Sequence, residues 1–436
     1  MNVGLIGLIV MIVFFIILFT GLNICFVLFG VALLFNFIIF GPQSLYMCFT
    51  AFSGAIRQET WIAIPLFVLL ASFLEASGIG SDLYDTMHKW MAGLKGGLAM
   101  GTAIICALID AMSGLGATAT VTMGLLALPE MLKRGYDKDM VLGVIPAGGA
   151  LGPLIPPSII MVVVGGMWGL SVGKLFMAGF IPGFLITFGF CIYIGVRCII
   201  QPHMGPPCSP EERGTWRERV FSLYKVVVPI IIILLMMVSI YSGAATPTET
   251  AGIGATATFL VILFRRKLTW KTLTTGLSIT LRITAMVVWL LIGGMAFGSF
   301  INSLGISELL TNFLTGLAIS KIIVLWVMMI IVLIMGCFID GGSIFMICSP
   351  VYWPVCQKMG WDPIWFGLLM TIAIVTGYIT PPFGMNLFYM KGLVPKGITM
   401  RDIYRSVIPY VFIMILGLVV SIHFPIVAMW LPSMMK

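Results

Sequence analysis

The sequence feature that most constrains the fold is a pair of Gly- and Pro-rich stretches, each in the middle of a long apolar segment. The first is Gly148–Ser158 (GGALGPLIPPS) and the second is Thr376–Gly384 (TGYITPPFG). Pro lacks a backbone N–H and clashes with the preceding turn, so an α-helix does not continue regularly through either stretch. Inside a membrane, non-helical backbone is tolerated only where it is buried in protein or lines a cavity. Each stretch therefore predicts a broken helix at a functional site.

Composition places these segments in a membrane. Hydrophobic residues make up 60% of the chain and charged residues 9%, and the mean hydropathy is +1.13. Apolar runs of about 20 residues recur along the chain, which predicts an all-α polytopic membrane protein. The net charge of +8 comes from Lys and Arg in short loops, so it indicates topology and not a nucleic-acid partner. The nine cysteines lack metal-type spacing and predict no disulfide framework.

The apolar runs predict ten full membrane spans. They lie at residues 3–20, 24–40, 60–77, 140–170, 176–196, 226–241, 250–264, 283–303 and 362–390 and near the C-terminus. Residues 82–95 are amphipathic and too short to cross, so we expect them at the membrane interface. Residues 197–225 form the most polar loop, and the positive-inside rule places it in the cytoplasm. Counting spans from this loop predicts that both termini are periplasmic.

Two further apolar segments do not fit a simple count of spans. Residues 96–132 are 37 in number with a polar interruption at 110–116, and residues 322–357 are 36 in number with an interruption at 340–343. Each segment is too short for two crossings of about 20 residues and too polar at its midpoint for one crossing. We therefore predict two re-entrant helical hairpins whose tips stop inside the membrane, at about 96–130 and 322–354.

The two halves of the chain repeat each other. An offset of 225 residues carries Gly152 onto Gly377 and the pair Pro156-Pro157 onto Pro381-Pro382. One offset that holds for several special residues indicates an internal repeat. The charge distribution brings the first hairpin in from the cytoplasm and the second from outside, so the repeats are inverted, as in secondary transporters. The predicted division is 1–58 (N-terminal scaffold helices), 59–199 (repeat 1), 200–282 (cytoplasmic loop and two linking scaffold helices) and 283–436 (repeat 2).

The breaks and the hairpin tips predict a site for a hard monovalent cation and an anion. Unwound carbonyls and small hydroxyls suit Na⁺, and this predicts as ligands Ser113, Gly114, Gly152, Leu154, Pro156, Gly341, Gly377, Thr380 and Phe383. An anionic substrate would lie against the half-helices that restart after the two Pro pairs, where the helix dipole is positive. The predicted substrate residues are Asp110, Ser158, Asp340, Ser343 and Asn386.

The polar residues in the membrane also have other interpretations. Asp110 and Asp340 each cost about 2.5–3.5 kcal/mol at the bilayer centre, which favours a functional role, but they could instead cap the hairpin turns. Glu249 is interpreted as a helix-start residue and not as a ligand. An intramembrane aspartyl enzyme would need the two Asp carboxylates close enough to share a proton.

Several motifs resemble one known family. They are Ser113–Gly124, Leu128–Tyr136, Gly152–Ser158, Ala178–Gly183, Thr246–Glu249 and Gly377–Phe388. Together they are similar to the large, DctM-like membrane subunit of tripartite ATP-independent periplasmic (TRAP) transporters, over nearly the whole chain. The chain departs from the usual pattern at the first hairpin tip, where Leu115 and Gly116 replace a further small hydroxyl residue. Part of the ion or substrate shell is therefore expected to differ.

The resemblance implies a function and a set of partners. The expected activity is Na⁺-coupled uptake of a carboxylate-containing organic acid across the bacterial inner membrane, by an elevator mechanism and without an organic cofactor. The expected partners are a periplasmic substrate-binding protein, a separate small four-helix membrane subunit and membrane lipid. The alternatives are an elevator anion symporter that works without a binding protein and, remotely, the aspartyl enzyme.

Overall fold

The computed structural model describes residues 3–114, 116–208, 215–316 and 319–435, and every regular element in these ranges is a helix. Leu115, at the tip of the first hairpin, and residues 209–214 of the polar loop lie outside the described residues. The first half of the chain forms α1 (Val3–Leu18), α2 (Ile24–Phe40), η1 (Pro42–Ser44), α3 (Leu45–Ile56), η2 (Glu59–Ile62), α4 (Ala63–Ala76), α5 (Ile79–Met91), α6 (Gly97–Ser113), α7 (Thr118–Lys133), α8 (Lys138–Gly149), α9 (Ile159–Trp168), α10 (Val172–Ile200) and η3 (Pro202–Met204).

The second half is also helical throughout the described ranges. It forms α11 (Trp216–Tyr241), α12 (Pro247–Phe264), α13 (Trp270–Ser303), α14 (Ile306–Gly316), α15 (Lys321–Gly336), α16 (Gly341–Met359), α17 (Pro363–Gly377), α18 (Met385–Leu393), α19 (Met400–His423) and α20 (Ile426–Met434). Six helical segments of the described chain are long and apolar enough to cross a membrane. The predicted all-α membrane class is therefore confirmed.

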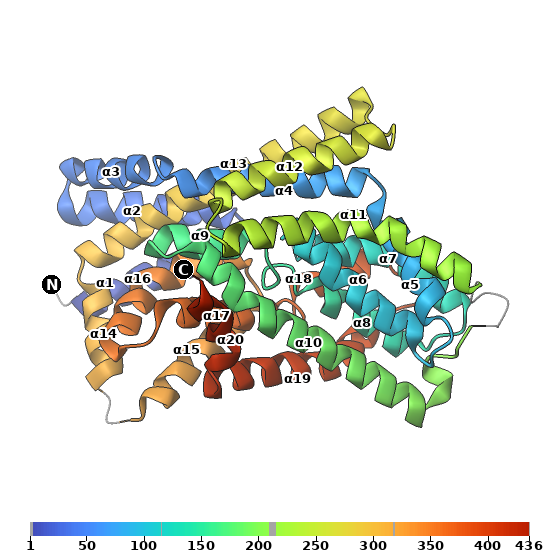
Figure 1. Cartoon of the computed structure of the whole chain (residues 1–436). Helices are drawn as coiled ribbons and strands as arrows, with labels where there is room; N and C mark the ends of the chain where they lie inside the picture. Colours follow the sequence, from blue (N-terminus) through green and yellow to red (C-terminus); the bar gives the residue numbers. More distant parts are fainter. Residues whose placement is uncertain (1–2, 115, 209–214, 317–318, 436) are drawn as a thin grey trace.

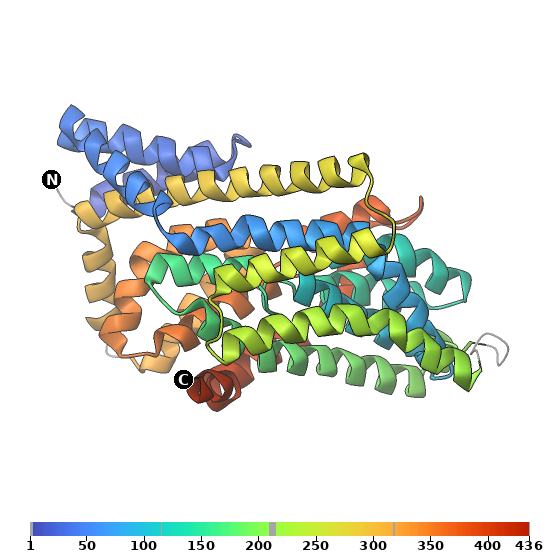
Figure 2. The same cartoon turned by 45° about the horizontal axis from the view of Figure 1, so that its top comes forward.

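The long helices run roughly along one direction, and two short helices lie across it at opposite ends of the molecule (Figures 1 and 2). These transverse helices are α5 and α14. The same order of helix types occurs twice: a span, a transverse helix, two hairpin helices, two halves of a broken helix and a second span. The first series is α4 to α10 and the second is α13 to α19. The inverted relation between the two series stays a prediction.

Both predicted breaks are present; the first is fully buried, whereas Pro382 and Phe383 of the second are exposed. α8 ends at Gly149 and α9 begins at Ile159, while α17 ends at Gly377 and α18 begins at Met385. Helix α8 is buried on all sides from Met140 onwards, as is α17 from Trp365 onwards. A helix that is apolar all round belongs in the interior of a bundle, and these two helices form its centre.

Several helix boundaries differ from those expected. α11 begins at Trp216 and not at Val226, because Thr215 and Glu218 form a reciprocal capping box. α13 begins at Trp270 and not at Ile283, after Thr269 accepts a hydrogen bond from the Thr272 N–H. The hydropathy of these first turns is low, so their helical continuation was missed. The helices α3 and α20 were not predicted either.

Two helix-start residues confirm the capping interpretation. Glu249 completes a capping box with Thr246 at the start of α12. Asp340 caps α16, and its carboxylate accepts a hydrogen bond from the Ser343 N–H at 3.1 Å. Asp110 does not cap a helix, because it lies within the last turn of α6.

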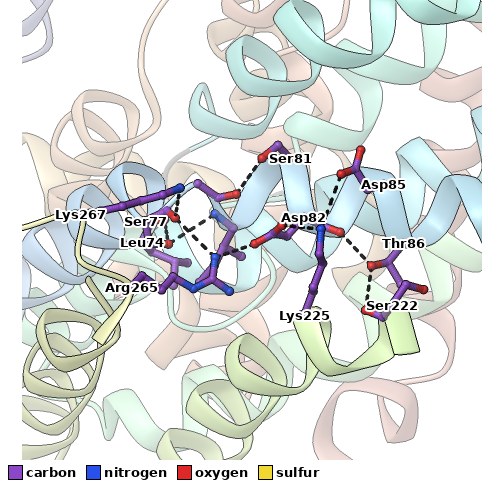
Figure 3. A network of polar contacts seen from close by, with 12 residues as sticks. Leu74, Ser77, Ser81, Asp82, Asp85, Thr86, Ser222, Lys225, Arg265 and Lys267 are labelled. Carbon is purple, nitrogen blue, oxygen red and sulfur yellow. Dashed lines mark hydrogen bonds and ion pairs between the residues drawn. The ribbon is translucent and has the colours of Figure 1, made fainter. Parts of the chain in front are cut away.

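A network of polar contacts fixes the transverse helix α5 to its neighbours (Figure 3). The Asp82 carboxylate accepts from the Arg265 guanidinium at 2.5 Å and lies 3.1 Å from the Lys225 ammonium. Lys267 donates to the Ser77 carbonyl at 2.8 Å, close to the C-terminus of α4. A cation at a helix C-terminus is favoured by the helix dipole. The network therefore joins the α4–α5 junction to α11 and to the loop after α12.

The same contacts change the acidity of Asp82. Burial alone would raise the pKa of its carboxyl, but hydrogen bonds from Arg265 and Lys225 outweigh burial and lower the pKa below its usual value. A carboxyl whose pKa is lowered by folding stabilises the folded state above its unfolded pKa of about 3.9, and that contribution is lost as the pH falls through the folded value.

Asp82→Asn is therefore expected to destabilise the protein at neutral pH. Removing the charge leaves Arg265 and Lys225 without their carboxylate, at a cost of about 1–3 kcal/mol. Thermal unfolding in detergent at pH 7 measures this loss, and the difference from wild type is expected to shrink below about pH 4. Asp85→Asn is the matched control, because Asp85 is 61% exposed and lies 3.8 Å from Lys225. Equal effects of the two substitutions would contradict the role of Asp82.

Candidate functional site

The tip of the first hairpin packs directly on the first break. Gly114 ends α6 with φ of 62°, in the left-handed region that favours glycine. A Cβ at this position would lie 2.5 Å from the carbonyl oxygen of Pro157. The two backbones therefore approach so closely that the tip has no room for a side chain at residue 114. The prediction brought Gly114 and Pro156 to one site, and here the tip and the break are in contact.

The first break is held by its own side chains. The Ser158 hydroxyl accepts from the Met161 N–H at 3.2 Å, which caps α9, and donates to the Pro153 carbonyl. The Pro156-Pro157 peptide bond is cis. The Leu154 carbonyl packs against Gly179 of α10. The carbonyl oxygen of Leu154, a predicted Na⁺ ligand, therefore faces the neighbouring helix α10.

The second hairpin meets the second break in a similar way. The Gly384 N–H donates to the Cys337 carbonyl at 2.8 Å, and the Gly341 N–H donates to the Tyr378 hydroxyl at 2.8 Å. Gly377 also approaches Gly336 so closely that a Cβ on Gly377 would lie 2.5 Å from the Gly336 Cα. The Pro381-Pro382 bond is cis. Three separate contacts thus join the ends of α15 and α16 to this break.

Asn386 connects the two halves of the molecule. Its side-chain amide donates to the Gly116 carbonyl at 3.0 Å and to the Pro146 carbonyl at 3.2 Å. Asn386 belongs to the first turn of α18, whereas Gly116 is at the first hairpin tip and Pro146 is in α8. Both hairpin tips and both breaks therefore lie around one centre.

A cavity of about 430 Å³ lies at this centre. Its polar lining comprises Glu75, Thr118, Asp340, Tyr378, Asn386 and Tyr389. Side chains of α13 form an apolar wall, with Ile283, Met286, Val287 and Leu290. A cavity with apolar walls and a few convergent polar groups is typical of a small-molecule site.

Four helix N-termini meet at this cavity. The lining includes the first residues of α7 (Thr118), α9 (Ile159) and α18 (Met385) and the second residue of α16 (Gly342). The first N–H groups of a helix have no partner inside the helix, and each N-terminus carries a positive partial charge of about half an elementary charge. The cavity therefore suits an anionic group.

The predicted substrate residues divide into two groups. Asp340 and Asn386 line the cavity. Ser343 donates to the Asp340 carboxylate, and Ser158 caps α9, so both support the site from behind its surface. Asp110 is fully buried. The Gly152 N–H faces its carboxylate but does not make a hydrogen bond of normal geometry with it. Neither carboxylate oxygen of Asp110 therefore has a hydrogen-bond partner among the described residues. Asp110 and Asp340 thus do not line a common cavity.

The predicted Na⁺ ligands fall at both junctions of tip and break. Ser113 and Gly114 lie beside the first break, which holds Gly152, Leu154 and Pro156. Gly341 lies at the start of α16 beside the second break, which holds Gly377, Thr380 and Phe383. The described residues contain no group of three or more His, Cys, Asp or Glu that could hold a metal ion. A cation here would depend on carbonyl and hydroxyl oxygens, and this donor set fits Na⁺.

A series of hollows leads from the cavity along α7 towards α5. A second hollow of about 240 Å³ shares Glu75, Thr118 and Val121 with the cavity. A third, of about 330 Å³, shares Ser81 and Leu126 with the second. Because consecutive hollows share lining residues, they lie next to one another in a row from the centre towards the end of the molecule at which α5 lies (Figure 1).

Four polar residues of the cavity were not predicted as site residues: Glu75, Thr118, Tyr378 and Tyr389. Tyr378 lies inside the second break, between the predicted Gly377 and Thr380, so its position was available as a signal. Tyr389 lies one helical turn beyond Asn386. Glu75 lies near the end of a span, and nothing in the local sequence connects it to the breaks.

The comparison with known proteins identifies a family. The model of "Tripartite ATP-independent periplasmic transporter, DctM component" matches residues 11–427. The C4-dicarboxylate TRAP transporter large permease protein DctM of Pseudomonas aeruginosa is 30% identical over 397 residues, which is 91% of each chain. The protein of the same name from Rhodobacter capsulatus is 30% identical over 401 residues, covering 88% of this chain and 89% of its own. Other relatives are named for isethionate, ectoine and sialic acid.

A solved structure supports the fold. The structure of Neisseria gonorrhoeae MtrF covers 90% of this chain and 85% of its own chain with a TM-score of 0.66, at 14% sequence identity. At this identity the similarity concerns the arrangement of helices alone.

Asn386→Asp is expected to disrupt the centre of the molecule. The substitution replaces an amide that donates to the Gly116 and Pro146 carbonyls by a carboxylate that only accepts, so three acceptors face one another. Two hydrogen bonds are lost and a buried charge is left without a partner, at a cost of about 3 kcal/mol or more. Thermal unfolding in detergent measures the effect.

Asn302→Asp is the matched control for this prediction. Asn302 is exposed, and its side-chain oxygen accepts from the Ser307 hydroxyl, a role that a carboxylate keeps. A melting temperature that falls equally in both variants would show that Asn386 is not the connecting residue that its hydrogen bonds indicate.

Proposed function

The chain belongs to the DctM family of large membrane subunits of tripartite ATP-independent periplasmic transporters, and on this basis we propose that it carries out Na⁺-coupled uptake of a carboxylate-containing organic acid. The family is one of transporters, so the chain is a membrane permease and not an enzyme. The observation that carries the proposal is the convergence of two hairpin tips and two helix breaks on one cavity.

The electrostatics of the cavity support an anionic substrate. The four helix N-termini place positive partial charge around it, and those of α7 and α18 have no side-chain cap. The carboxylate of an organic acid accepts hydrogen bonds from the N–H groups of such helix ends, while the apolar wall on α13 contacts its carbon chain. Relatives named for C4-dicarboxylate, isethionate and sialic acid suggest the chemical range to test.

The breaks support Na⁺ as the coupling ion. Their carbonyls and the Ser113 and Thr380 hydroxyls are oxygen donors, and the described chain holds no acidic cluster there. Asp340 adds one negative charge at the edge of the cavity. In the proposed cycle, Na⁺ neutralises part of this negative charge and orders the tips against the breaks. The acid then binds to a site whose helix N-termini are held in place.

We further propose that access alternates by an elevator movement. The hairpins and broken helices would move as one unit against α4, α12 and α13, because hydrogen bonds of Asn386 and Tyr378 connect the moving parts to one another. The row of separate hollows along α7 supports a conformation that opens at the end where α5 lies. That end carries many of the basic loop residues and is the proposed cytoplasmic end.

The family works with two partners, a periplasmic binding protein and a small membrane subunit. We propose that the chain receives its acid from such a binding protein and works with a separate four-helix subunit in the bacterial inner membrane. A carrier of the same architecture that needs no binding protein is the alternative that the following experiment also tests.

The function is tested by reconstituting the chain with both partners in liposomes under an imposed inward Na⁺ gradient. Radiolabelled succinate, isethionate, ectoine and sialic acid are offered in turn. We expect uptake of at least one of them that requires both Na⁺ and the binding protein. Uptake without the binding protein would support the alternative carrier, and uptake that is independent of Na⁺ would contradict the proposed coupling.

Thr380→Ala is expected to weaken Na⁺ coupling. Thr380 lies in the second break, where its hydroxyl donates to the Thr376 carbonyl at 2.7 Å and keeps its oxygen lone pairs for a cation. Loss of one oxygen ligand is expected to raise the Na⁺ concentration for half-maximal uptake by about tenfold, which corresponds to about 1.4 kcal/mol.

Thr315→Ala is the control, because Thr315 makes the same type of bond to the Thr311 carbonyl, at 2.8 Å, in the transverse helix α14. Its Na⁺ dependence is expected to remain that of wild type. An unchanged Na⁺ dependence in Thr380→Ala would remove this residue from the cation site.

A further inference from the structure

One side of α13 carries a row of polar side chains inside the membrane-spanning part of the molecule. The row consists of Lys271, Thr275, Ser278 and Arg282, and we call it the α13 polar stripe. Spacings of four, three and four residues place side chains on one side of an α-helix. All four residues are exposed on this chain. No side-chain hydrogen bond or ion pair joins Thr275, Ser278 or Arg282 to any residue that the structure describes.

Arg282 lies deep in the span and not at its end. Because α13 begins at Trp270, Arg282 is preceded by more than three helical turns. Gly276 packs against the Phe73 ring of α4, and Arg282 lies about 9 Å further along α13. An Arg at such a depth costs about 2.5–3.5 kcal/mol unless it finds a polar partner.

The same side of α13 is covered by a helix further along. Trp289 and Gly293 continue the spacing of the stripe, and both contact the start of α2: the rings of Phe26 and Trp289 are 5.6 Å apart, and a Cβ on Gly293 would lie 2.5 Å from the Cys25 carbonyl. α2 begins at Ile24, so its cover ends about two helical turns beyond Arg282. The α13 polar stripe is therefore the uncovered continuation of a helix-packing face.

We propose that the α13 polar stripe is the docking site for a membrane-spanning helix of the separate small membrane subunit, and that this helix carries a carboxylate opposite Arg282. The proposal rests on the proposed function for the existence of that subunit. A helix of the small subunit placed in line with α2 would cover the stripe. A carboxylate neutralises Arg282, and small hydroxyl residues such as Thr275 and Ser278 allow two helices to approach closely and form hydrogen bonds.

The position of the stripe favours a protein partner over the transported acid. The wall of the central cavity is formed by Ile283, Met286, Val287 and Leu290. The stripe is rotated about 100° from this face around the helix axis, as the position of Arg282 next to Ile283 shows. Arg282 lines a separate hollow of about 500 Å³ that shares Ile283 with the cavity and is open to the outside of the bundle.

Site-specific photocrosslinking tests the docking site independently of transport. The photoreactive amino acid p-benzoylphenylalanine replaces Ser278, and the full chain is co-expressed with the small membrane subunit and irradiated in membranes. We expect a crosslink to that subunit. The matched control places the probe at Leu281, which is 72% exposed but lies to the side of the stripe, and here we expect no crosslink to the subunit. Equal crosslinking at both positions, or none at Ser278, overturns the proposal.

A charge series tests the role of Arg282. Arg282→Gln is expected to reduce co-purification of the small subunit by about tenfold or more, because the ion pair is lost. Arg282→Lys is expected to retain much of the co-purification, because the positive charge is kept. Lys396→Gln is the control for a general loss of positive charge, because Lys396 is exposed in the loop between α18 and α19, outside the stripe. Co-purification that is unchanged in Arg282→Gln overturns the ion pair.

An aqueous reagent distinguishes the other occupants of this surface. Arg282→Cys is treated with a membrane-impermeant methanethiosulfonate, with and without the small subunit. Protection by the subunit supports docking. If succinate blocks the labelling and the subunit does not, Arg282 belongs to the path of the acid, and the proposal is overturned. Crosslinks from Ser278 to a second copy of this chain assign the stripe to self-association and overturn it as well. Each result leaves the test of Na⁺-dependent uptake by the whole transporter intact.

Discussion

The structure depends on the need of the interrupted helices to find new partners for their backbone groups. Two buried helices stop near the middle of the bundle and restart after Pro pairs, which leaves carbonyls and N–H groups outside regular hydrogen bonding. The hairpin tips provide the partners. Gly114 fits against Pro157 because it has no side chain, and Gly384 donates to Cys337 at the other tip. The cavity lies where the N-termini of the two restarted helices, α9 and α18, meet those of the hairpin helices α7 and α16, so the positive helix ends around it follow from the interruptions and the tips together.

Much of this arrangement could be predicted because Gly and Pro act locally. The offset that connects Gly152 with Gly377 located both breaks, and the length of the segments between basic loops located both hairpins. The cavity wall could not be predicted in the same way. Glu75 and the α13 residues reach the cavity through helix packing, which leaves no short-range pattern. The start of α13 lies at Trp270 and not at the expected Ile283. The first turns of this helix carry many polar residues, so their average hydropathy resembles that of a loop.

The two transverse helices are held differently, which bears on the proposed movement. Asp82 joins α5 to Arg265 and Lys225, and Thr86 donates to the Ser222 carbonyl at 3.0 Å. No ion pair links α14 to another part of the described chain, and it packs mainly on α16 of the second hairpin. If the hairpins move against the scaffold, the ion pairs of Asp82 hold α5 to the scaffold helices. Within the described chain, α14 has no such ion pair and can move together with the second hairpin. The Asp82–Arg265 pair is partly buried, so salt screens it less than it screens fully exposed charges.

The proposed coupling of cation and acid follows from how the central contacts depend on one another. Asn386 lies in the cavity wall and also holds the first hairpin tip through Gly116, so a group that contacts Asn386 acts on the tip as well. Tyr378 has the same double position, since it lines the cavity and accepts from Gly341 of the second hairpin. A cation held between a tip and a break stabilises the contact that positions these side chains, and an acid bound to them stabilises the same contact from the cavity side. Each ligand then favours binding of the other by the same free energy, and this reciprocity is what symport through one centre requires.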